Sequence, residues 1–322
     1  MIIDIIGDVH GYADKLIGLL EQLGYVHNGE HYVPPEGHRA LFIGDLIDRG
    51  TQQIKTLEIV FAMLDADVAD AVMGNHEYNA IAYATPDPNK PGQYLRSHDE
   101  THTRQHETFL AEVPFGSTLH QYWIQRFYEI PLWIETDEAC FVHACWDVDS
   151  MALLKPMLTA DNCLTPHALE VTSREFTPPF DALERVLKGV ETPLPEGVVM
   201  VDKQGTVRKR VRVRWWLSDL NERTLLEVAR APSSALAQIP IDALAKNIDF
   251  TLKTHKPIFV GHYWLLGEPQ PLSPQVICTD YSAAMDSGYL TCYQFDTSRP
   301  LPLTAERFVQ YRHDEVSDSA EQ

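Results

Sequence analysis

The sequence predicts an α+β fold from two observations. Three short apolar runs near the N-terminus have the composition of buried parallel strands, and a segment with helical periodicity follows each of them. Further short apolar runs return in the last quarter of the chain, after a middle region in which helical patterns dominate. The 322 residues are enough to bury a large core, and we expect them to form one domain, residues 1–322.

Strands and helices alternate in the N-terminal part. The expected pairs of strand and helix are residues 2–6 and 12–23, residues 40–43 and 52–64, and residues 71–73 with a helix that continues through residue 84. Leucines at helical spacing define the first helix, and Gly24 ends it. The dipeptide Asn28-Gly29 indicates a hairpin before the second strand.

Residues 85–130 are expected to be an insertion that contains helices. His98, His102 and His106 recur every four residues, which places them on one face of a helix. A solvated face is the first interpretation, and a cap that faces the substrate or binds an extra metal is the alternative. Further histidines are expected on the surface, among them His27, His31 and His120.

An antiparallel strand pair, residues 132–135 and 139–142, precedes a second candidate insertion, residues 150–250. The second insertion is mixed in pattern and mostly helical. Within it, residues 207–216 alternate arginine with valine, which predicts a half-buried strand with one cationic face. We expect most of these arginines to pair with surface carboxylates, and contact with a phosphate is the alternative.

The last part of the chain returns to strands. They are expected over residues 256–260, 275–279 and 290–295, with a possible last strand over residues 307–312. Asp280 follows one of these strands and is interpreted as a buried structural carboxylate. The tail, residues 316–322, is acidic and rich in small residues, so we expect it to be flexible.

The composition excludes several classes of partner. The formal net charge is 26 − 46 = −20, which opposes binding of duplex nucleic acid and of anionic membranes. No apolar run approaches the roughly 20 residues that span a bilayer, and the N-terminal run lacks a basic flank. Five cysteines without a CxxC motif fit free thiols in a reducing compartment, so we expect a cytoplasmic protein.

Three polar loops follow the three N-terminal strands. They are residues 7–11 (Gly-Asp-Val-His-Gly), 44–50 (Gly-Asp-Leu-Ile-Asp-Arg-Gly) and 74–77 (Gly-Asn-His-Glu). Ligand groups gather at the carboxyl ends of parallel strands, so these loops are expected to meet. Asp, His and Asn without thiolates suit manganese, iron or zinc ions in a catalytic site. The three motifs in this order predict a hydrolytic site with two metals.

The chemistry of such a site explains the residue types. Two cations roughly 3.5–4 Å apart need a bridging ligand, and the water between them becomes a hydroxide near neutral pH that can attack phosphorus in line. The leaving oxygen needs a proton, and a histidine held by a carboxylate supplies it. His76 and Asp48 have the right types for that pair, and Arg49 offers a planar fork for a phosphate.

These motifs resemble those of the calcineurin-like metallophosphoesterases, in the branch of phosphoprotein phosphatases and symmetrical diadenosine tetraphosphatases. That family has DxH, GDxxDRG and GNHE motifs, then a histidine after a strand and a late Gly-His pair, and all five occur here in order. The resemblance implies a four-layer sandwich in which two mixed β-sheets pack face to face with helices outside.

The resemblance also implies a role for each matching residue. One metal is expected on Asp8, His10 and Asp45, and a second metal is expected on Asp45, Asn75, His143 and His262. His76 is expected to be the general acid, with Asp48 as its orienting partner and Arg49 as a phosphate clamp. The cofactors are then two divalent cations, with manganese first and iron, zinc, nickel or cobalt as alternatives.

Three departures from the family pattern affect specificity. Residues 143–146 read His-Ala-Cys-Trp where the protein phosphatases often have His-Gly-Gly, and Trp146 is expected to narrow the cleft or stack on a base. A second phosphate-binding arginine stays open between Arg214 and Arg223. The late motif Gly261-His262-Tyr263 lacks a second histidine, which favours the protein-phosphatase branch.

Three functions remain open from the sequence. The first is a phosphomonoesterase of the serine/threonine phosphatase type, acting on a phosphoprotein or a small phosphate ester. The second is a hydrolase of dinucleoside polyphosphates or another phosphodiesterase at the same site. The third is a metal-binding regulator without turnover, and the complete set of expected ligands together with His76 and Asp48 argues against it.

Overall fold

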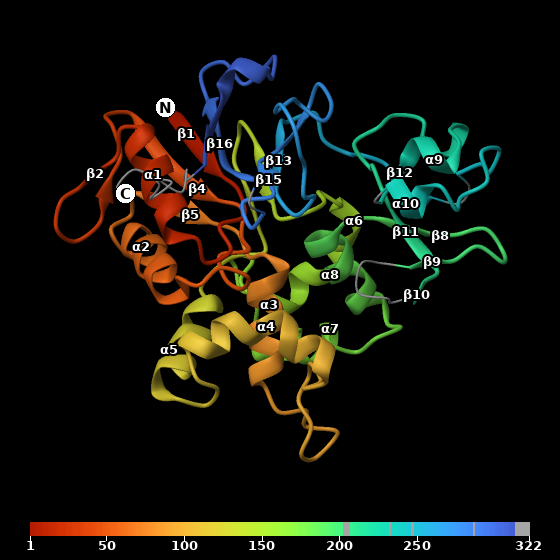
Figure 1. The fold of residues 1–322 in the computed structure, drawn as a ribbon, viewed down its shortest axis with the longest axis horizontal. Helices are drawn as coiled ribbons and strands as arrows, with labels where there is room; N and C mark the ends of the chain where they lie inside the picture. Colours follow the sequence, from red (N-terminus) through yellow and green to blue (C-terminus); the bar gives the residue numbers. More distant parts are fainter. Residues whose placement is uncertain (202–206, 232, 246–247, 286, 313–322) are drawn as a thin grey trace, which may run out of the picture.

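The computed structural model describes residues 1–322 except 202–206, 232, 246–247, 286 and 313–322. Two larger β-sheets form the centre of the molecule, and helices lie around them (Figure 1). The expected α+β class is confirmed. The tail for which we expected flexibility, residues 316–322, lies outside the described residues.

The first sheet has the three N-terminal strands at its centre. In spatial order its strands are β15 (Asp280–Tyr281), β16 (Tyr289–Asp296), β1 (Ile2–Ile6), β4 (His38–Phe42) and β5 (Ala69–Ala71), and β17 (Phe308–Tyr311) also pairs with β16. Strands β1, β4 and β5 run parallel, as the sequence predicts, while β16 runs antiparallel to β1. The loops after β1, β4 and β5 therefore leave from one edge of this sheet.

The second sheet is built from the middle and late parts of the chain. Its spatial order is β14 (Val276–Cys278), β13 (Ile258–Val260), β7 (Cys140–Val142) and β6 (Trp133–Glu135). The expected antiparallel pair of β6 and β7 is present, and β13 runs parallel to both β7 and β14. Strands β7 and β13 therefore also end at a common edge.

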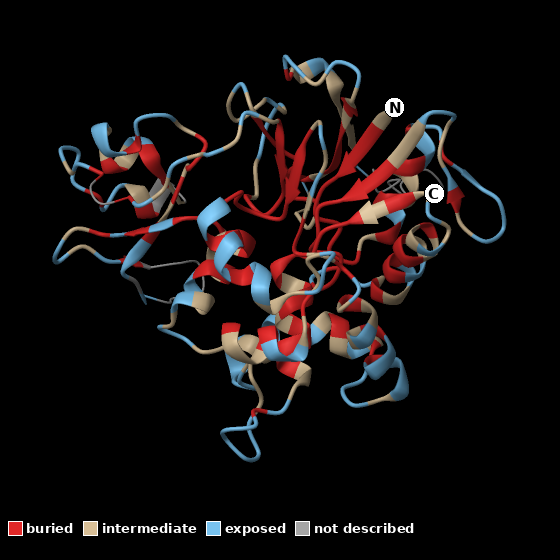
Figure 2. Ribbon diagram, turned by 180° about the vertical axis from the view of Figure 1, so that it is seen from behind, coloured by how far each residue is buried: buried red, intermediate tan, exposed pale blue. Residues whose placement is uncertain are grey.

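The two sheets pack face to face through an apolar layer. This layer combines side chains of both sheets, namely Ile3, Ile5, Leu41, Ile43, Val72, Tyr293 and Phe295 with Ala139, Phe141, Phe259 and Ile277. Alternate residues of the same strands, such as Ala40 and Phe42, join a second apolar cluster beneath the helices. Figure 2 shows the strands of both sheets as mostly buried. Burial on both faces explains why the sequence runs are continuously apolar.

Helices α1 (Ala13–Gln22) and α2 (Gln53–Asp65) supply that second cluster with Leu16, Leu19, Leu57 and Val60. Their bounds agree with the expected helices to within one residue at each end. The expected hairpin at Asn28-Gly29 is formed by β2 (Val26–His27) and β3 (Tyr32–Val33). Helix α3 (Asn75–Ala84) starts directly inside the third polar loop.

The first candidate insertion contains α4 (Glu100–Glu112) and α5 (Thr118–Phe127). The side chains of Asp99 and Ser117 cap these helices by accepting bonds from backbone N–H groups. His98 precedes the Asp99 cap, so the expectation that three histidines share one helix face is wrong. Three further helices and a 3-10 turn follow β7: α6 (Val148–Leu154), the 3-10 turn (Lys155–Met157), α7 (Pro166–Thr172) and α8 (Pro178–Lys188).

Beyond α8 the second candidate insertion changes to short strands. They are β8 (Glu191–Pro193), β9 (Met200–Val201), β10 (Val207–Arg208), β11 (Arg210–Val213) and β12 (Ala229–Arg230), with a 3-10 turn (Leu220–Glu222), α9 (Leu225–Val228) and α10 (Ser233–Leu236). The expected strand over residues 207–216 is thus two shorter strands, and the expectation of mostly helix is wrong from residue 189 onward. Valine and threonine between prolines favour short strands here.

The remaining 3-10 turn, Ala305–Arg307, leads into β17. Among the described residues, none of the helices is both long enough and apolar enough to cross a bilayer.

Candidate active site

The expected site residues lie in loops at the carboxyl ends of five strands. Asp8 and His10 follow β1, Asp45 and Asp48 follow β4, Asn75 and His76 open α3 after β5, His143 follows β7, and His262 follows β13. The first three loops belong to one sheet and the last two belong to the other. The site is therefore assembled at the junction of the two sheets.

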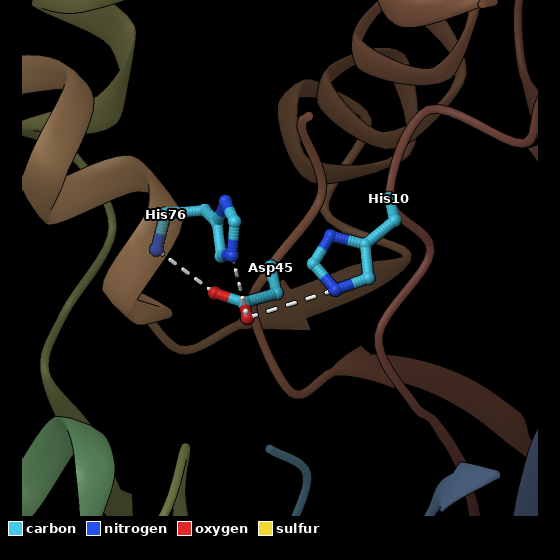
Figure 3. A group of neighbouring side chains, drawn as sticks. All are labelled: His10, Asp45 and His76. Atoms are coloured by element: carbon cyan, nitrogen blue, oxygen red, sulfur yellow. Dashed lines mark hydrogen bonds and ion pairs between the residues drawn. The ribbon is translucent and has the colours of Figure 1, made fainter. Parts of the chain in front are cut away.

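One carboxylate oxygen forms the centre of this arrangement. The Oδ2 atom of Asp45 lies 3.3 Å from Nε2 of His143 and 3.8 Å from Nε2 of both His10 and His76. Figure 3 shows His10 and His76 turned toward Asp45 from opposite sides. The His10 and His76 rings are edge to face at 4.8 Å between centroids. Three imidazoles from three loops thus converge on one buried oxygen.

Two groups of possible metal donors share Asp45. The first group is His10, Asp45 and His76, and the second group is Asp45, His143 and His262. Within each group the donor atoms all lie within 4.8 Å of one another. A carboxylate common to two groups is the geometry that a bridging ligand between two cations requires.

Asp8 and Asn75 lie beside these groups. The carboxylate of Asp8 accepts a bond from the backbone N–H of His262 at 3.1 Å, but Asp8 belongs to neither group of donors found among the described residues. The Oδ1 atom of Asn75 is buried and, among the described residues, accepts no hydrogen bond. An amide oxygen left in that state needs another partner.

The histidine tautomers fit metal binding. Nδ1 of His10 lies 2.9 Å from the carbonyl of Ile47, and Nδ1 of His143 lies 2.6 Å from the carbonyl of Ile43. A carbonyl oxygen only accepts, so Nδ1 must donate, and in the neutral rings the lone pair is left on Nε2. Within the described part of the chain, the buried Nε2 atoms of His10, His143 and His262 make no hydrogen bond. These residues fit divalent cations that accept nitrogen and oxygen ligands.

The electrostatics also favour a cation. Burial raises the pKa of Asp8 well above its usual value, and the nearby carboxylates of Asp280 and Asp45 add to this rise. Burial alone would lower the pKa of His143, but the carboxylates of Asp45 and Asp8 raise it to about 10. The buried carboxylates of Asp45 and Asp8 therefore favour a positive charge near the Nε2 atom of His143.

The backbone of the site is strained. Several residues have positive φ angles, namely His10 (51°), Asp45 (50°), Asp48 (69°), Arg49 (72°), His262 (68°) and Trp264 (49°). Such conformations cost energy in non-glycine residues and cluster where function requires them. Glycines allow the loops to come this close, because a Cβ on Gly74 would collide with Asp45 and a Cβ on Gly261 would collide with Asp8.

Glu77 is a buried residue that the sequence interpretation missed. Its carboxylate accepts bonds from the backbone N–H groups of Gly74 (2.9 Å), Asp45 (2.9 Å) and Leu46 (2.8 Å). It therefore ties the Asp45 loop to the start of α3. The signal was available, because Glu77 is the third residue of a helix that begins after Gly74, the position from which an acidic side chain reaches back.

His76, Asp48 and Arg49 form the remaining part of the site. Nδ1 of His76 bonds to Oδ2 of Asp48 at 2.5 Å. Burial opposes a positive charge on His76, but the carboxylates of Asp45 and Asp48 raise its pKa above the usual value overall. Arg49 is exposed, and its guanidinium lies 4.0 Å from the centre of the Trp264 ring. Asp280 holds Trp264 by accepting its backbone N–H at 2.6 Å, in line with the structural role expected for Asp280.

Two of the inserted histidines differ from the expectation of a surface position, whereas His98 is exposed as expected and His102 is partly exposed. His106 and His120 are buried, and His106 Nδ1 bonds to Oδ1 of Asp48 at 2.8 Å. His98 is stacked between Tyr83 and Tyr94, with ring centroids at 3.7 and 4.0 Å. The bond to the distant Asp48 explains the error for His106, and packing of His120 near Phe109 and Phe115 explains the error for His120. His27 is exposed, as expected.

The structure also bears on Trp146 and on the arginines of β11. Trp146 is buried, so its ring is not presented to a base. Among the β11 arginines, Arg210 pairs with Glu191 as expected for a surface residue. Burial lowers the pKa of His262, and the positive charge of Arg212 lowers it further. The positive charge of Arg212 therefore acts on His262, and the choice of Arg214 or Arg223 as a second phosphate-binding arginine stays a prediction.

Comparison with known proteins gives a family for the N-terminal part. The model of the family described as calcineurin-like phosphoesterase matches residues 1–135. These residues include the first three polar loops.

Two curated relatives match shorter stretches of the chain. The asymmetrical bis(5'-nucleosyl)-tetraphosphatase PrpE of Geobacillus thermodenitrificans is 45% identical over 76 residues, which is 24% of this chain and 31% of that protein. The protein of the same name from Bacillus subtilis is 34% identical over 90 residues, covering 28% of this chain and 37% of that protein. The chain thus spans about a third of the length of these relatives. Their name specifies asymmetrical cleavage, whereas the sequence resemblance was to the symmetrical enzymes.

A solved structure extends the likeness to the whole fold. A protein serine/threonine phosphatase from Saccharomyces cerevisiae superimposes with a TM-score of 0.52 over 99% of this chain and 82% of that chain, at 14% identity. A likeness at this identity shows the fold, and it agrees with the expected sandwich of two sheets.

Proposed function

We propose that the protein is a metal-dependent hydrolase of phosphoric esters, because the calcineurin-like phosphoesterase model matches residues 1–135. The observation that carries the proposal is the convergence of three imidazoles on the Oδ2 atom of Asp45. That family depends on a pair of metal ions, and the shared carboxylate supports such a pair here.

The proposed ligands come from both sheets. His10 and Asp45 would hold one cation, and Asp45, His143 and His262 would hold the other, with Asp8 and Asn75 completing the two sets. Two such cations activate a water molecule and neutralise charge on the phosphoryl oxygens. Manganese is the first candidate, and the donor set also suits iron, zinc, nickel or cobalt.

We propose that His76 donates the proton that the leaving oxygen needs. Its Nδ1 atom is bound to Asp48, so its Nε2 atom is the one free to face a substrate. The carboxylates of Asp45 and Asp48 raise the pKa of the ring above its usual value, which favours the protonated form that a general acid needs. Asp48 fixes the orientation of the ring and stabilises its charge.

Arg49 is the proposed phosphate clamp. The Trp264 ring covers one face of its guanidinium and leaves the edge, with its forked N–H groups, for a phosphate. Arg212 adds positive charge beside His262. These local cations offset the net charge of −20, which on its own would repel an anionic substrate.

The first candidate substrate is a phosphate monoester on a serine, a threonine or a small molecule. The likeness to a protein serine/threonine phosphatase in fold is compatible with it but does not select it. A dinucleoside polyphosphate is the second candidate, because two curated relatives are named bis(5'-nucleosyl)-tetraphosphatases.

Hydrolysis assays with added Mn²⁺ separate these candidates. We expect turnover of p-nitrophenyl phosphate and of a phosphoserine peptide, with slower turnover of bis(p-nitrophenyl) phosphate. Preferential hydrolysis of diadenosine tetraphosphate would select the second candidate, and its products would give the position of cleavage. Absence of all turnover in protein that retains two metals would contradict the proposal and favour a regulator.

A further inference from the structure

His106 occupies an unusual position for a residue of an inserted helix. It lies on α4, is only 5% exposed, and bonds through Nδ1 to Oδ1 of Asp48 at 2.8 Å. The other carboxylate oxygen of Asp48, Oδ2, bonds to Nδ1 of His76. Asp48 is therefore held between two imidazoles, one on each oxygen.

The His106 ring is itself held by aromatic neighbours. Phe109 stacks on it at 4.9 Å with an interplanar angle of 22°, and Tyr83 meets it edge to face at 5.4 Å. Phe109 is fully buried and Tyr83 is 5% exposed. Two buried aromatic side chains thus restrict the His106 ring, whose Nδ1 atom points at the Asp48 carboxylate.

We propose that His106 is a positioning residue that sets the plane of the Asp48 carboxylate and, through it, the direction of the His76 ring. This inference rests on the proposed function, in which His76 is the general acid. A carboxylate with a bond on one oxygen can rotate, whereas bonds to both oxygens leave one orientation. Through His106 on α4, the first candidate insertion then helps to orient the group that donates the proton.

A packing role for His106 is the competing explanation, and the leaving group distinguishes the two. A residue that acts through the general acid affects poor leaving groups most, because good leaving groups depart without a proton. Phenyl phosphate has a poor leaving group and p-nitrophenyl phosphate has a good one, while the two esters differ little in size. A packing defect would change both rates by the same factor.

The test uses H106L, which removes the donor, and H106N, which keeps an N–H near the position of Nδ1. We expect H106L to lower kcat for phenyl phosphate about 10-fold, a fraction of the ~10²–10⁴ that general acid catalysis contributes. The same variant should lower kcat for p-nitrophenyl phosphate less than about 3-fold, and H106N should restore most of the loss. Equal losses on both substrates, or no advantage of H106N over H106L, would overturn the proposal.

Two further variants sharpen the result. H120L removes another buried histidine of the same helical region, at 2% exposure, and should not change the ratio of the two rates. In an H76N background, H106L should add less than about 2-fold, because residues that act through one group are not additive. An additive loss there would contradict action through His76.

If H106L does not fold, H106N is compared with H106Q instead. The amide of Gln reaches the position of Nε2, whereas the amide of Asn reaches the position of Nδ1. Asn should then exceed Gln on phenyl phosphate, and equal rates would overturn the proposal. Wild-type protein that hydrolyses neither ester with two metals bound would instead refute the proposed function.

Discussion

The carboxylate of Glu77 accepts the backbone N–H of Asp45 at 2.9 Å, and so the residue at the centre of the site is positioned by a side chain that belongs to another motif. Glu77 also binds the N–H groups of Gly74 and Leu46, and it is fully buried. The loop with positive φ at Asp45 keeps its shape because these donors have a partner.

Replacement of Glu77 by Gln is expected to destabilise the fold. The amide of Gln places a donor against backbone N–H donors, and hydrogen bonds to a charged group are worth about 1.5–3 kcal/mol. Denaturant unfolding of E77Q should show a loss of at least that size. The exposed Glu107 on α4 provides a matched control, for which E107Q should stay within about 0.5 kcal/mol of the parent.

Replacement of Asp45 by Ala should remove both metals, since Asp45 is the residue common to the two groups of donors. Elemental analysis of purified D45A after dialysis is the measurement. D48N, which removes a carboxylate outside both groups, should retain two metals per chain. Retention of two metals by D45A would exclude Asp45 as the bridge.

Replacement of His76 by Asn should separate metal binding from turnover. Metal content should stay at the parent value, whereas kcat for phenyl phosphate should fall by ~10²–10⁴, the usual contribution of a general acid. The loss should be much smaller for p-nitrophenyl phosphate. An unchanged rate on phenyl phosphate would remove His76 from the proposed role.

Replacement of Trp264 by Leu should weaken the grip of Arg49 on the phosphate. A cation–π contact at an exposed site is worth about 0.5–1 kcal/mol, which corresponds to a roughly 2- to 5-fold rise in KM. W264F keeps a ring beneath the guanidinium and should lie near the parent value. Steady-state kinetics on p-nitrophenyl phosphate gives the KM of each variant. Identical KM values for W264L and the parent would contradict the proposed role of Arg49 as a phosphate clamp.

The burial of the cysteines predicts which thiols react with a disulfide reagent. All five cysteines lie in the described part of the chain as free thiols, and four of them are buried: Cys140, Cys145, Cys278 and Cys292. Burial raises the pKa of the Cys145, Cys278 and Cys292 thiols well above the usual value and that of Cys140 to about 12, so few thiolates form near neutral pH.

Titration of native protein with a disulfide reagent should therefore modify Cys163 first, and C163S should lose that fast phase. Unfolded protein should react at all five positions. Since only the thiolate reacts, and burial also raises the pKa of Cys163, the rate at Cys163 should increase as the pH rises above neutral. A fast phase that persists in C163S would show that another cysteine is accessible.

The sequence was sufficient for the strands and for the loops that follow them. Continuous apolar runs predict strands buried on both faces, and Asp, His and Asn at their carboxyl ends predict where ligands gather, as the positions of Asp45 and His143 illustrate. Such features are local, so a single sequence contains them. The cytoplasmic location, the single domain and the identity of the metals stay predictions.

The contacts of Asp48 with His106 and of Arg49 with Trp264 could not be predicted in the same way. Each joins segments far apart in the chain, and no local pattern records such a pairing. His106 has the helical spacing of a surface residue, but packing against Phe109 and Tyr83 overrides that pattern. Beyond α8, strands of two to four residues are too short for periodicity to identify.

The division of the candidate ligands between two sheets has a consequence for assembly. The donor group of Asp45, His143 and His262 combines a carboxylate from one sheet with two imidazoles from the other, so neither half alone offers this second site. A cation bound there links the two sheets and stabilises their contact. By mass action, the melting temperature should then climb with the concentration of free divalent ion, and a chain that has not yet joined its two halves should be unable to bind the cation of this second site.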